Sequence, residues 1–139
     1  MTDKLQLEIV TPYGPLVEES VDEVIVPGAL GEMGILPGHL PLLSSLDTGR
    51  IAYRSGAQEK NLSVSWGFVE VDAEGRVILL ADTAEKAEDI DLKRAEDART
   101  KAEQALADLS DTTSEEYRKQ ELKLQRATIR IQVASKQGS

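Results

Sequence analysis

The hydrophobic pattern of the chain changes near residue 85, and this change constrains the fold more than any other feature. Before it lie nine of the ten glycines and all five prolines. After it there is no proline, and the next glycine is Gly138. Proline and glycine mark turns and are unfavourable inside helices, so the first part favours short strands and the second favours long helices. We therefore expect two structural units, residues 1–85 and 86–139.

The first unit has the alternation that is typical of β-strands. Residues 5–9 alternate apolar and polar side chains with period two, and the turn-forming residues 11–15 follow them. Further short strands are expected at residues 21–26, 50–54, 61–65, 68–72 and 76–81. Many short strands separated by turns predict a sandwich or a flattened barrel.

The second unit has the spacing of an antiparallel pair of helices, with one apolar stripe on each. The expected stripes are Leu92, Ala95, Ala98, Ala102, Ala105 and Leu109 on the first helix and Tyr117, Leu124, Ala127, Ile131 and Ala134 on the second. The polar residues 108–114 separate the helices, and Thr112 or Thr113 is expected to cap the second. Alanine buries little area, so the pair needs a partner surface. A pair permanently docked on the sheet and a moving part are equally compatible with this pattern.

The composition excludes several classes of protein. The net charge of −9 argues against a nucleic-acid binder and against electrostatic docking on an anionic bilayer. The absence of cysteine and the single histidine exclude thiolate metal sites, disulfides and a His-rich metal site. No run approaches the ~20 apolar residues of a membrane span. Residues 1–5 lack the apolar region of a signal peptide, so we expect a soluble protein that is not exported.

The basic residues of the second helix form a cationic face. They recur at steps of four, three and four, and are Lys119, Lys123, Arg126 and Arg130. One interpretation is a solvated face, or a face paired with the acidic first helix. The other is a surface for an acidic partner or a phosphate ligand. The charge pattern alone leaves both open.

Two further residues have more than one interpretation. His39 lies in a loop-like stretch, where it either takes part in proton transfer or holds a turn or an interface. Asp91, or Asp89 before it, can cap the first helix, which is a sufficient reason for an acid there. Arg94 lies three residues after Asp91, within reach of the same helical face.

Three motifs resemble those of a known family, the epsilon subunits of bacterial F-type ATP synthases, called delta in mitochondria. Residues 31–42 are similar to the signature G-E-[LM]-G-[IV]-x-P-G-H-x-P-L. Residues 10–15 resemble the end of the family's first strand and its turn, and residues 65–71 its S-G-G-[FI]-x-E-V segment, with Trp66 where glycine is common. The resemblance covers essentially the whole chain. It implies an α+β fold, a β-sandwich of about ten short strands followed by a mobile two-helix hairpin.

The resemblance also implies a non-catalytic rotor subunit of the central stalk. Its sandwich would bind the gamma subunit and rest on the c-ring, at the cytoplasmic face of the bacterial inner membrane, with membrane association only through the complex. By motif position, Glu32 and His39 would face the c-ring or its border. The hairpin would extend into the catalytic head and inhibit ATP hydrolysis. The cationic face would then meet acidic surfaces of the beta and alpha subunits.

A further motif implies ATP as a regulatory ligand rather than a required cofactor. Residues 90–95 look like the [IL]-D-x-x-R-A motif with which some members of the family bind ATP. The matching positions are Glu85, Ile90, Asp91, Arg94, Ala95, Lys101, Arg126 and Arg130. Lys101 stands for a family arginine, with Arg99 nearby, and lysine keeps the charge but lacks the bidentate fork. Two other classes are a stand-alone ATP-binding sensor and a small hydrolase, and the lack of a nucleophile–base set argues against the second.

Overall fold

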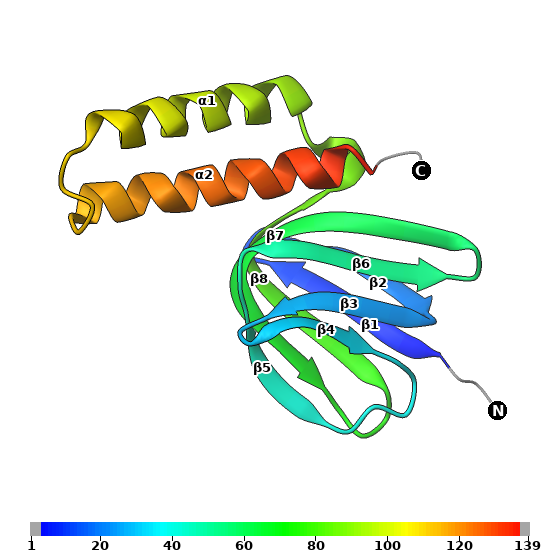
Figure 1. Ribbon diagram of the computed structural model, residues 1–139. Coiled ribbons are helices and arrows are strands. Elements are labelled where there is room, and N and C mark those ends of the chain that lie inside the picture. Colours follow the sequence, from blue (N-terminus) through cyan, green and yellow to red (C-terminus); the bar gives the residue numbers. More distant parts are fainter. Residues whose placement is uncertain (1–3, 137–139) are drawn as a thin grey trace. The chain divides into compact units, whose positions relative to one another are not determined.

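The computed structural model describes residues 4–136. The first three residues, part of the N-terminus expected to lack a signal peptide, and residues 137–139 lie outside the described residues. The chain divides into two compact units between Lys86 and Ala87 (Figure 1). Strands make up the first unit and helices the second. Within residues 4–136, no helix combines the length and the hydropathy that a membrane span requires.

The first unit is a β-sandwich, as expected, with eight strands among the described residues rather than about ten. The strands are β1 (Leu5–Thr11), β2 (Gly14–Val21), β3 (Glu23–Gly28), β4 (Gly31–Ile35), β5 (Leu42–Leu46), β6 (Gly49–Ser55), β7 (Gln58–Val71) and β8 (Arg76–Lys86). They follow the order β2-β1-β8-β7-β5-β3-β4, and β6 bridges β3 and β7. This bridge folds the hydrogen-bonded sheet back on itself (Figure 1).

The strand count is lower than expected because β7 runs without interruption through two expected strands, residues 61–65 and 68–72. The first half of β7 pairs with β6 and the second half pairs with β5. β8 accompanies it along both halves. Residues 21–26, expected as one strand, instead divide at Asp22 between β2 and β3. The expected ranges also missed β5, all of β2 except Val21, and β4, in which two of the five residues are glycine and the alternation is weak.

Alternating side chains of these strands fill the core between the layers. Leu5, Leu7 and Ile9 of β1 are at most 2% exposed. The same is true of inward-facing residues on four other strands, namely Val24, Val26, Ile51, Val69, Val71, Val77 and Leu79. Each such side chain contributes roughly 1.5–3 kcal/mol relative to an exposed position. The core therefore belongs to the first unit alone.

A sharp corner in β7 joins the two layers. Up to Val64 the strand pairs with β6, and from Gly67 onward it pairs with β5. Trp66, between them, has φ +62°, in the left-handed region that bulky residues rarely adopt. Gly67 has φ +152°, and a Cβ there would overlap the carbonyl oxygen of Leu80 on β8. This backbone explains why glycine is common at position 66 in the family that the chain resembles.

The second unit confirms the expected helix pair. It contains a short 3-10 turn, η1 (Ala87–Asp89), and the helices α1 (Leu92–Asp108) and α2 (Glu115–Ala134), which pack against each other in antiparallel directions (Figure 1). The side chain of Asp91 caps α1 by accepting a hydrogen bond from the amide of Arg94 at 3.1 Å. The residues buried on the two helices are small or medium in size: Ala95, Ala102, Ala127 and Val133. Leu92, expected in the stripe, is 43% exposed.

The cap of α2 differs from the expectation. Ser114 is the cap, and its hydroxyl accepts a hydrogen bond from the amide of Tyr117 at 3.1 Å. Thr113 does not cap because its hydroxyl and its amide both donate to Asp111, at 2.6 and 2.9 Å. These two bonds lower the pKa of Asp111, the hydroxyl more than the amide. The helix therefore begins one residue later than a Thr113 cap would allow.

Asp22 is the centre of an ion-pair cluster on the first unit. Its carboxylate lies 2.8 Å from the Lys4 ammonium and 3.6 Å from the Arg54 guanidinium, and accepts the Gly56 amide at 2.7 Å. The bond from Lys4 lowers the pKa of Asp22 most, followed by the bond from Gly56. The cluster thus ties the start of β1 and the β6–β7 turn to the β2–β3 junction.

We predict that Gly67→Ala destabilises the first unit by about 1–3 kcal/mol, because the new Cβ overlaps the Leu80 carbonyl. Thermal unfolding should show a fall in Tm of several degrees. Gly34→Ala is the matched control, since its Cβ would meet only the Glu23 carboxylate at 3.9 Å. Equal Tm values for the two variants would show that the close approach of β7 and β8 at this corner is not required.

We predict that Asp22→Asn lowers Tm at neutral pH and that this difference shrinks in acid. A carboxyl whose folded pKa lies below its unfolded value stabilises the fold above the unfolded pKa, about 3.9 for Asp. That contribution is lost as the pH falls through the folded pKa, so the wild type and the variant should converge once the pH lies below the folded pKa of Asp22. Glu59→Gln, an exposed carboxyl outside the cluster, is the control for general charge effects. A Tm difference that is independent of pH would contradict the role of the charge.

Candidate functional site

The segment that the resemblance assigns to the c-ring starts on β4, at one end of the strand order. Glu32 is exposed on β4, opposite Pro27 in the register with β3. His39 lies beyond β4 in a tight turn, where its amide donates to the Leu36 carbonyl at 3.0 Å. Its Nδ1 is 2.8 Å from the Leu40 carbonyl, which accepts only, so Nδ1–H donates this bond. Of the two interpretations of His39, this geometry favours the residue that holds a turn.

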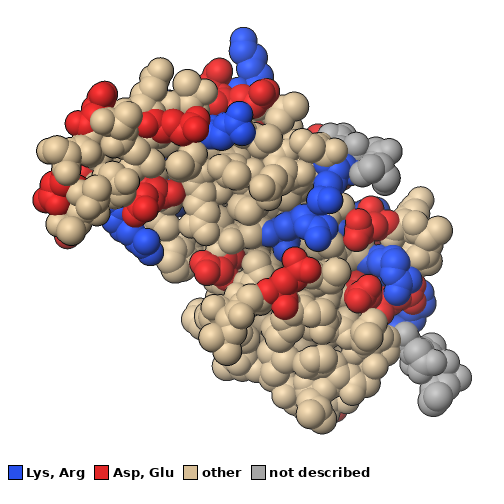
Figure 2. Space-filling model, viewed as in Figure 1, with Lys and Arg blue, Asp and Glu red and all other residues tan. Residues whose placement is uncertain are grey.

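Exposed leucines lie in this turn, on the following strand β5 and in the β3–β4 hairpin at the other end of β4. Leu30, Leu36, Leu40 and Leu43 are all more than half exposed, and Leu40 is 79% exposed. Figure 2 shows few charged side chains over the lower part of the first unit, where β4 and β5 lie in Figure 1. Exposed apolar residues in such a group are typical of a protein-contact surface. The segment is therefore suited to contact with a protein.

The residues matched to an ATP site divide between the two units. Glu85 lies on β8 in the first unit, opposite Ser63 in the register with β7. The other seven, Ile90, Asp91, Arg94, Ala95, Lys101, Arg126 and Arg130, belong to the second unit. Ile90 and Ala95 are buried, at 8% and 0% exposure, so their side chains contribute to packing.

The antiparallel helix pair brings several of these cations to the same end of the hairpin. The first half of α1 carries Arg94, and it runs beside the second half of α2, which carries Arg126 and Arg130 (Figure 1). Arg94 is exposed, while Arg126 and Arg130 are half-buried. Among residues 4–136, no carboxylate pairs with Arg94 or Arg126. Guanidinium groups in such an arrangement are suited to an anionic ligand.

The cationic face of α2 is accessible along most of its length. Lys119 and Lys123 are exposed. In the part of the chain that the structure describes, no carboxylate pairs with Lys119, Lys123 or Arg126. Pairing with the acidic first helix is therefore not observed for these three residues. A solvated face and a surface for an acidic partner both fit this geometry.

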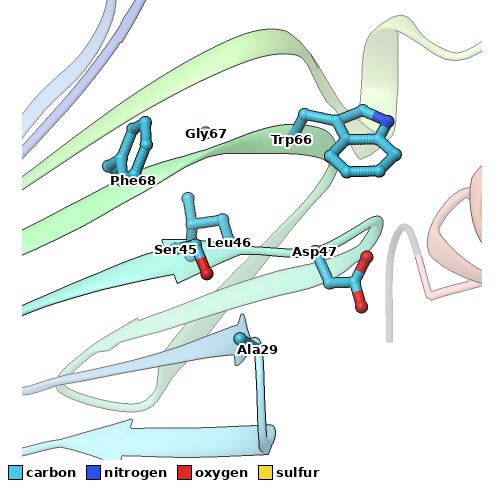
Figure 3. A pocket seen from close by; sticks show the side chains of 7 residues that line it. All are labelled: Ala29, Ser45, Leu46, Asp47, Trp66, Gly67 and Phe68. Atoms are coloured by element: carbon cyan, nitrogen blue, oxygen red, sulfur yellow. The ribbon is translucent and has the colours of Figure 1, made fainter.

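A pocket on the first unit was missed by the sequence analysis. It has a volume of about 370 Å³ and lies where β3, β5 and β7 meet (Figure 3). Its lining is Ala29, Ser45, Leu46, Asp47, Trp66, Gly67 and Phe68. The sequence feature that could have indicated this pocket is Trp66, which stands at a position where the family that the chain resembles commonly has glycine. Among the described residues, no group of three His, Cys, Asp or Glu side chains could hold a metal ion.

Comparisons with known proteins match both units. The family model for the ATP synthase delta/epsilon chain β-sandwich domain matches residues 4–87, and the model for the long α-helix domain of the same chain matches residues 88–135. The chain is 48% identical to "ATP synthase epsilon chain 2" of Syntrophotalea carbinolica, over 99% of each sequence. It is 47% identical to "ATP synthase epsilon chain" of Geobacter metallireducens, over 98% of this chain and 97% of the relative.

Two solved structures share the fold at low sequence identity. One is a chain in the cryo-EM structure of Euglena gracilis mitochondrial ATP synthase, OSCP/F1/c-ring, with a TM-score of 0.79 and 22% identity over 92% of this chain and 79% of that one. The other comes from the central stalk/c-ring of Tetrahymena thermophila mitochondrial ATP synthase, with a TM-score of 0.59 and 14% identity over 99% of this chain and 100% of that one. The match of both units, and relatives nearly half identical from end to end, place the chain in one family. It belongs to the epsilon chains of bacterial F-type ATP synthase, which are non-catalytic subunits.

Proposed function

We propose that the chain is the central-stalk subunit that joins the gamma subunit to the c-ring of a proton-translocating ATP synthase. The main support for this proposal is the end-to-end similarity to epsilon chains, because both units of this chain have a counterpart in those relatives. The structural neighbours from Euglena and Tetrahymena belong to c-ring assemblies, which supports the same location. The complex would hold the chain at the cytoplasmic face of the inner membrane.

The exposed turn after β4 is the part of the sandwich suited to the c-ring. His39 donates a hydrogen bond to the Leu40 carbonyl in this turn, and Glu32 offers a charge near the other end of β4, beside the β3–β4 hairpin. The exposed leucines supply apolar contact area. The c-ring contact would thus combine a shaped apolar loop with a polar rim.

The helix pair is the part suited to inhibiting ATP hydrolysis. Lys119, Lys123 and Arg126 have no ion pair among residues 4–136, so this face is available to acidic surfaces of the beta and alpha subunits. Burial of mainly small side chains holds α1 and α2 together, so rearrangement of the pair disrupts little packing. A helix pair with these two properties is suited to move between the stalk and the catalytic head.

ATP would act on this equilibrium by binding one arrangement of the hairpin. Arg94 and Arg126 lie at the same end of the pair, and an anion bound between the helices would reduce the repulsion between their like charges. A ligand that binds only the folded hairpin stabilises it by RT ln(1 + [L]/Kd), about 2.7 kcal/mol at a hundredfold excess over Kd. This energy is sufficient to shift a nearly balanced two-state element.

We predict that the full chain forms a stable complex with the gamma subunit and inhibits ATP hydrolysis by an epsilon-depleted enzyme. In the variant Lys119→Glu/Lys123→Glu, gamma binding should stay unchanged while inhibition falls severalfold, because the reversed charges repel acidic surfaces of the head. Gel filtration measures the complex, and steady-state ATPase assays measure the inhibition.

Arg118→Glu is the matched control for this pair, since Arg118 lies about 100° around the helix from Lys119. It should inhibit like the wild type. A wild-type chain that does not bind gamma would refute the central-stalk role. Equal inhibition by the double variant and the wild type would refute the role of the cationic face.

We also predict that ATP binds the isolated chain and that Arg126→Ala weakens this binding at least about tenfold, because charge-assisted bonds to phosphate are lost. An NMR titration should show saturable shifts in both helices. Arg118→Ala, which removes an arginine from the same helix outside the matched positions, should bind ATP like the wild type. No shift up to millimolar ATP would refute the ATP site, and the Asp91–Arg94 pattern would then serve helix capping and packing. Binding of ATP by a chain that does not bind gamma would instead favour the stand-alone sensor.

A further inference from the structure

The pocket at the β7 corner combines aromatic rings with a carboxylate. Trp66 and Phe68 are 44% and 56% exposed, so both rings are available at the surface. Asp47, just after β5, is the one charged residue in the pocket lining among the described residues. Figure 3 shows the indole of Trp66 and the carboxylate of Asp47 toward the same end of the pocket, with the Phe68 ring toward the other. An aromatic face with a carboxylate near it is suited to a cation.

Trp66 has a backbone conformation that tryptophan rarely adopts. Its φ of +62° lies in the left-handed region, where glycine is free of strain and a bulky residue is an outlier. Strained backbone of this kind persists where the surrounding structure enforces it, and it concentrates at functional sites. The corner of β7 enforces this left-handed backbone but does not require a tryptophan, since glycine would adopt it without strain. The indole is only partly buried, so it is open to a contact outside this chain.

Hydrogen bonds hold Asp47 in place, but its carboxylate forms no ion pair within the described residues. One carboxylate oxygen accepts the amide of Thr48 at 3.0 Å, and the Asp47 amide donates to the Pro27 carbonyl at 2.8 Å. No Lys, Arg or His of residues 4–136 forms an ion pair with it. The surrounding residues 1–85 carry 14 acidic and 5 basic side chains, so their field attracts cations. The guanidinium of arginine fits best, because it stacks on an indole and donates two parallel bonds to a carboxylate.

We propose that this pocket receives an arginine side chain of the gamma subunit, stacked on Trp66 and paired with Asp47. The proposal rests on the proposed function, which supplies gamma as the partner. Charge complementarity selects a basic side chain. The pocket also adjoins the exposed apolar surface, since Leu30 follows Ala29 and Leu43 shares β5 with Ser45. Trp66 and Asp47 would thus determine which gamma subunits this chain accepts.

The single tryptophan of the chain gives a direct probe of the pocket. Incorporation of 5-fluorotryptophan places one ¹⁹F signal at Trp66, and unlabelled gamma should shift it on forming the complex. A signal that stays unchanged in the complex overturns the proposal. A shift that depends on the concentration of this chain without gamma also overturns it, since the occupant would then be a second copy.

Binding measurements on full-length variants test the two side chains separately. Asp47→Asn keeps the acceptor for Thr48 and should weaken gamma binding by about 10-fold to 100-fold, with a weaker dependence on salt. Trp66→Gly should weaken it by at least about tenfold while Tm stays equal or rises, because glycine relieves the backbone strain. Glu59→Gln and Tyr13→Ala, which change an exposed acid and an exposed aromatic residue elsewhere, are the matched controls.

The outcomes separate this proposal from the function on which it rests. If the wild type binds gamma and both pocket variants bind within about twofold of it, the arginine site is overturned and the central-stalk role stands. If the wild type does not bind gamma, the proposed function is overturned, and the arginine site with it. Loss of binding in Trp66→Gly with an unchanged or higher Tm supports the site, since a purely structural role for Trp66 would move Tm and binding together.

Discussion

The close approach of β7 and β8 at Gly67 is the constraint on which the first unit depends. At this point β7 leaves β6 and joins β5, so a single strand belongs to both layers of the sandwich. The approach leaves no space for a Cβ between Gly67 and the Leu80 carbonyl, and only glycine meets that condition. The preceding residue, Trp66, completes the change of chain direction by adopting a left-handed backbone conformation, which bulky residues rarely do. The apolar core, the strand order and the pocket at the corner all follow from this turn of the chain.

The two units differ in how strongly they are held together. The sandwich has a core of branched and long aliphatic side chains, many of them with no exposed surface. The residues that the helix pair buries are mainly alanine, with Val133 as the largest in α1 and α2. Burial scales with apolar area, so separation of the helices costs far less than opening of the sandwich. A rigid unit that binds partners and a pair of helices that is easily rearranged are consistent with a stalk subunit that carries a regulatory element.

Charge divides along the same boundary and gives each unit a different class of partner. Residues 1–85 are strongly acidic, whereas residues 86–139 have 11 acidic and 11 basic side chains. Most ion pairs observed on the sandwich involve Asp22 or Glu23. Asp47, at the pocket, forms no ion pair among residues 4–136. On α2 four of the basic residues share one face, and three of these, Lys119, Lys123 and Arg126, have no carboxylate partner in the described part of the chain. The sandwich therefore suits a basic contact and the helices an acidic surface or a phosphate ligand.

The sequence by itself determined the fold class and the family. Period-two alternation, helical spacing and the placement of proline and glycine are local properties, and the motif of residues 31–42 is long enough to identify relatives. It also narrowed the cap of α1 to Asp89 or Asp91, because a cap is a contact between near neighbours, and Asp91 is the cap in the structure. Only the tertiary structure decided that β7 is one strand, that Ser114 caps α2, and that Asp47 and Trp66 line the same pocket. These facts depend on which distant backbone segments pair and on competition among hydrogen bonds, and neither leaves a periodic trace in the sequence.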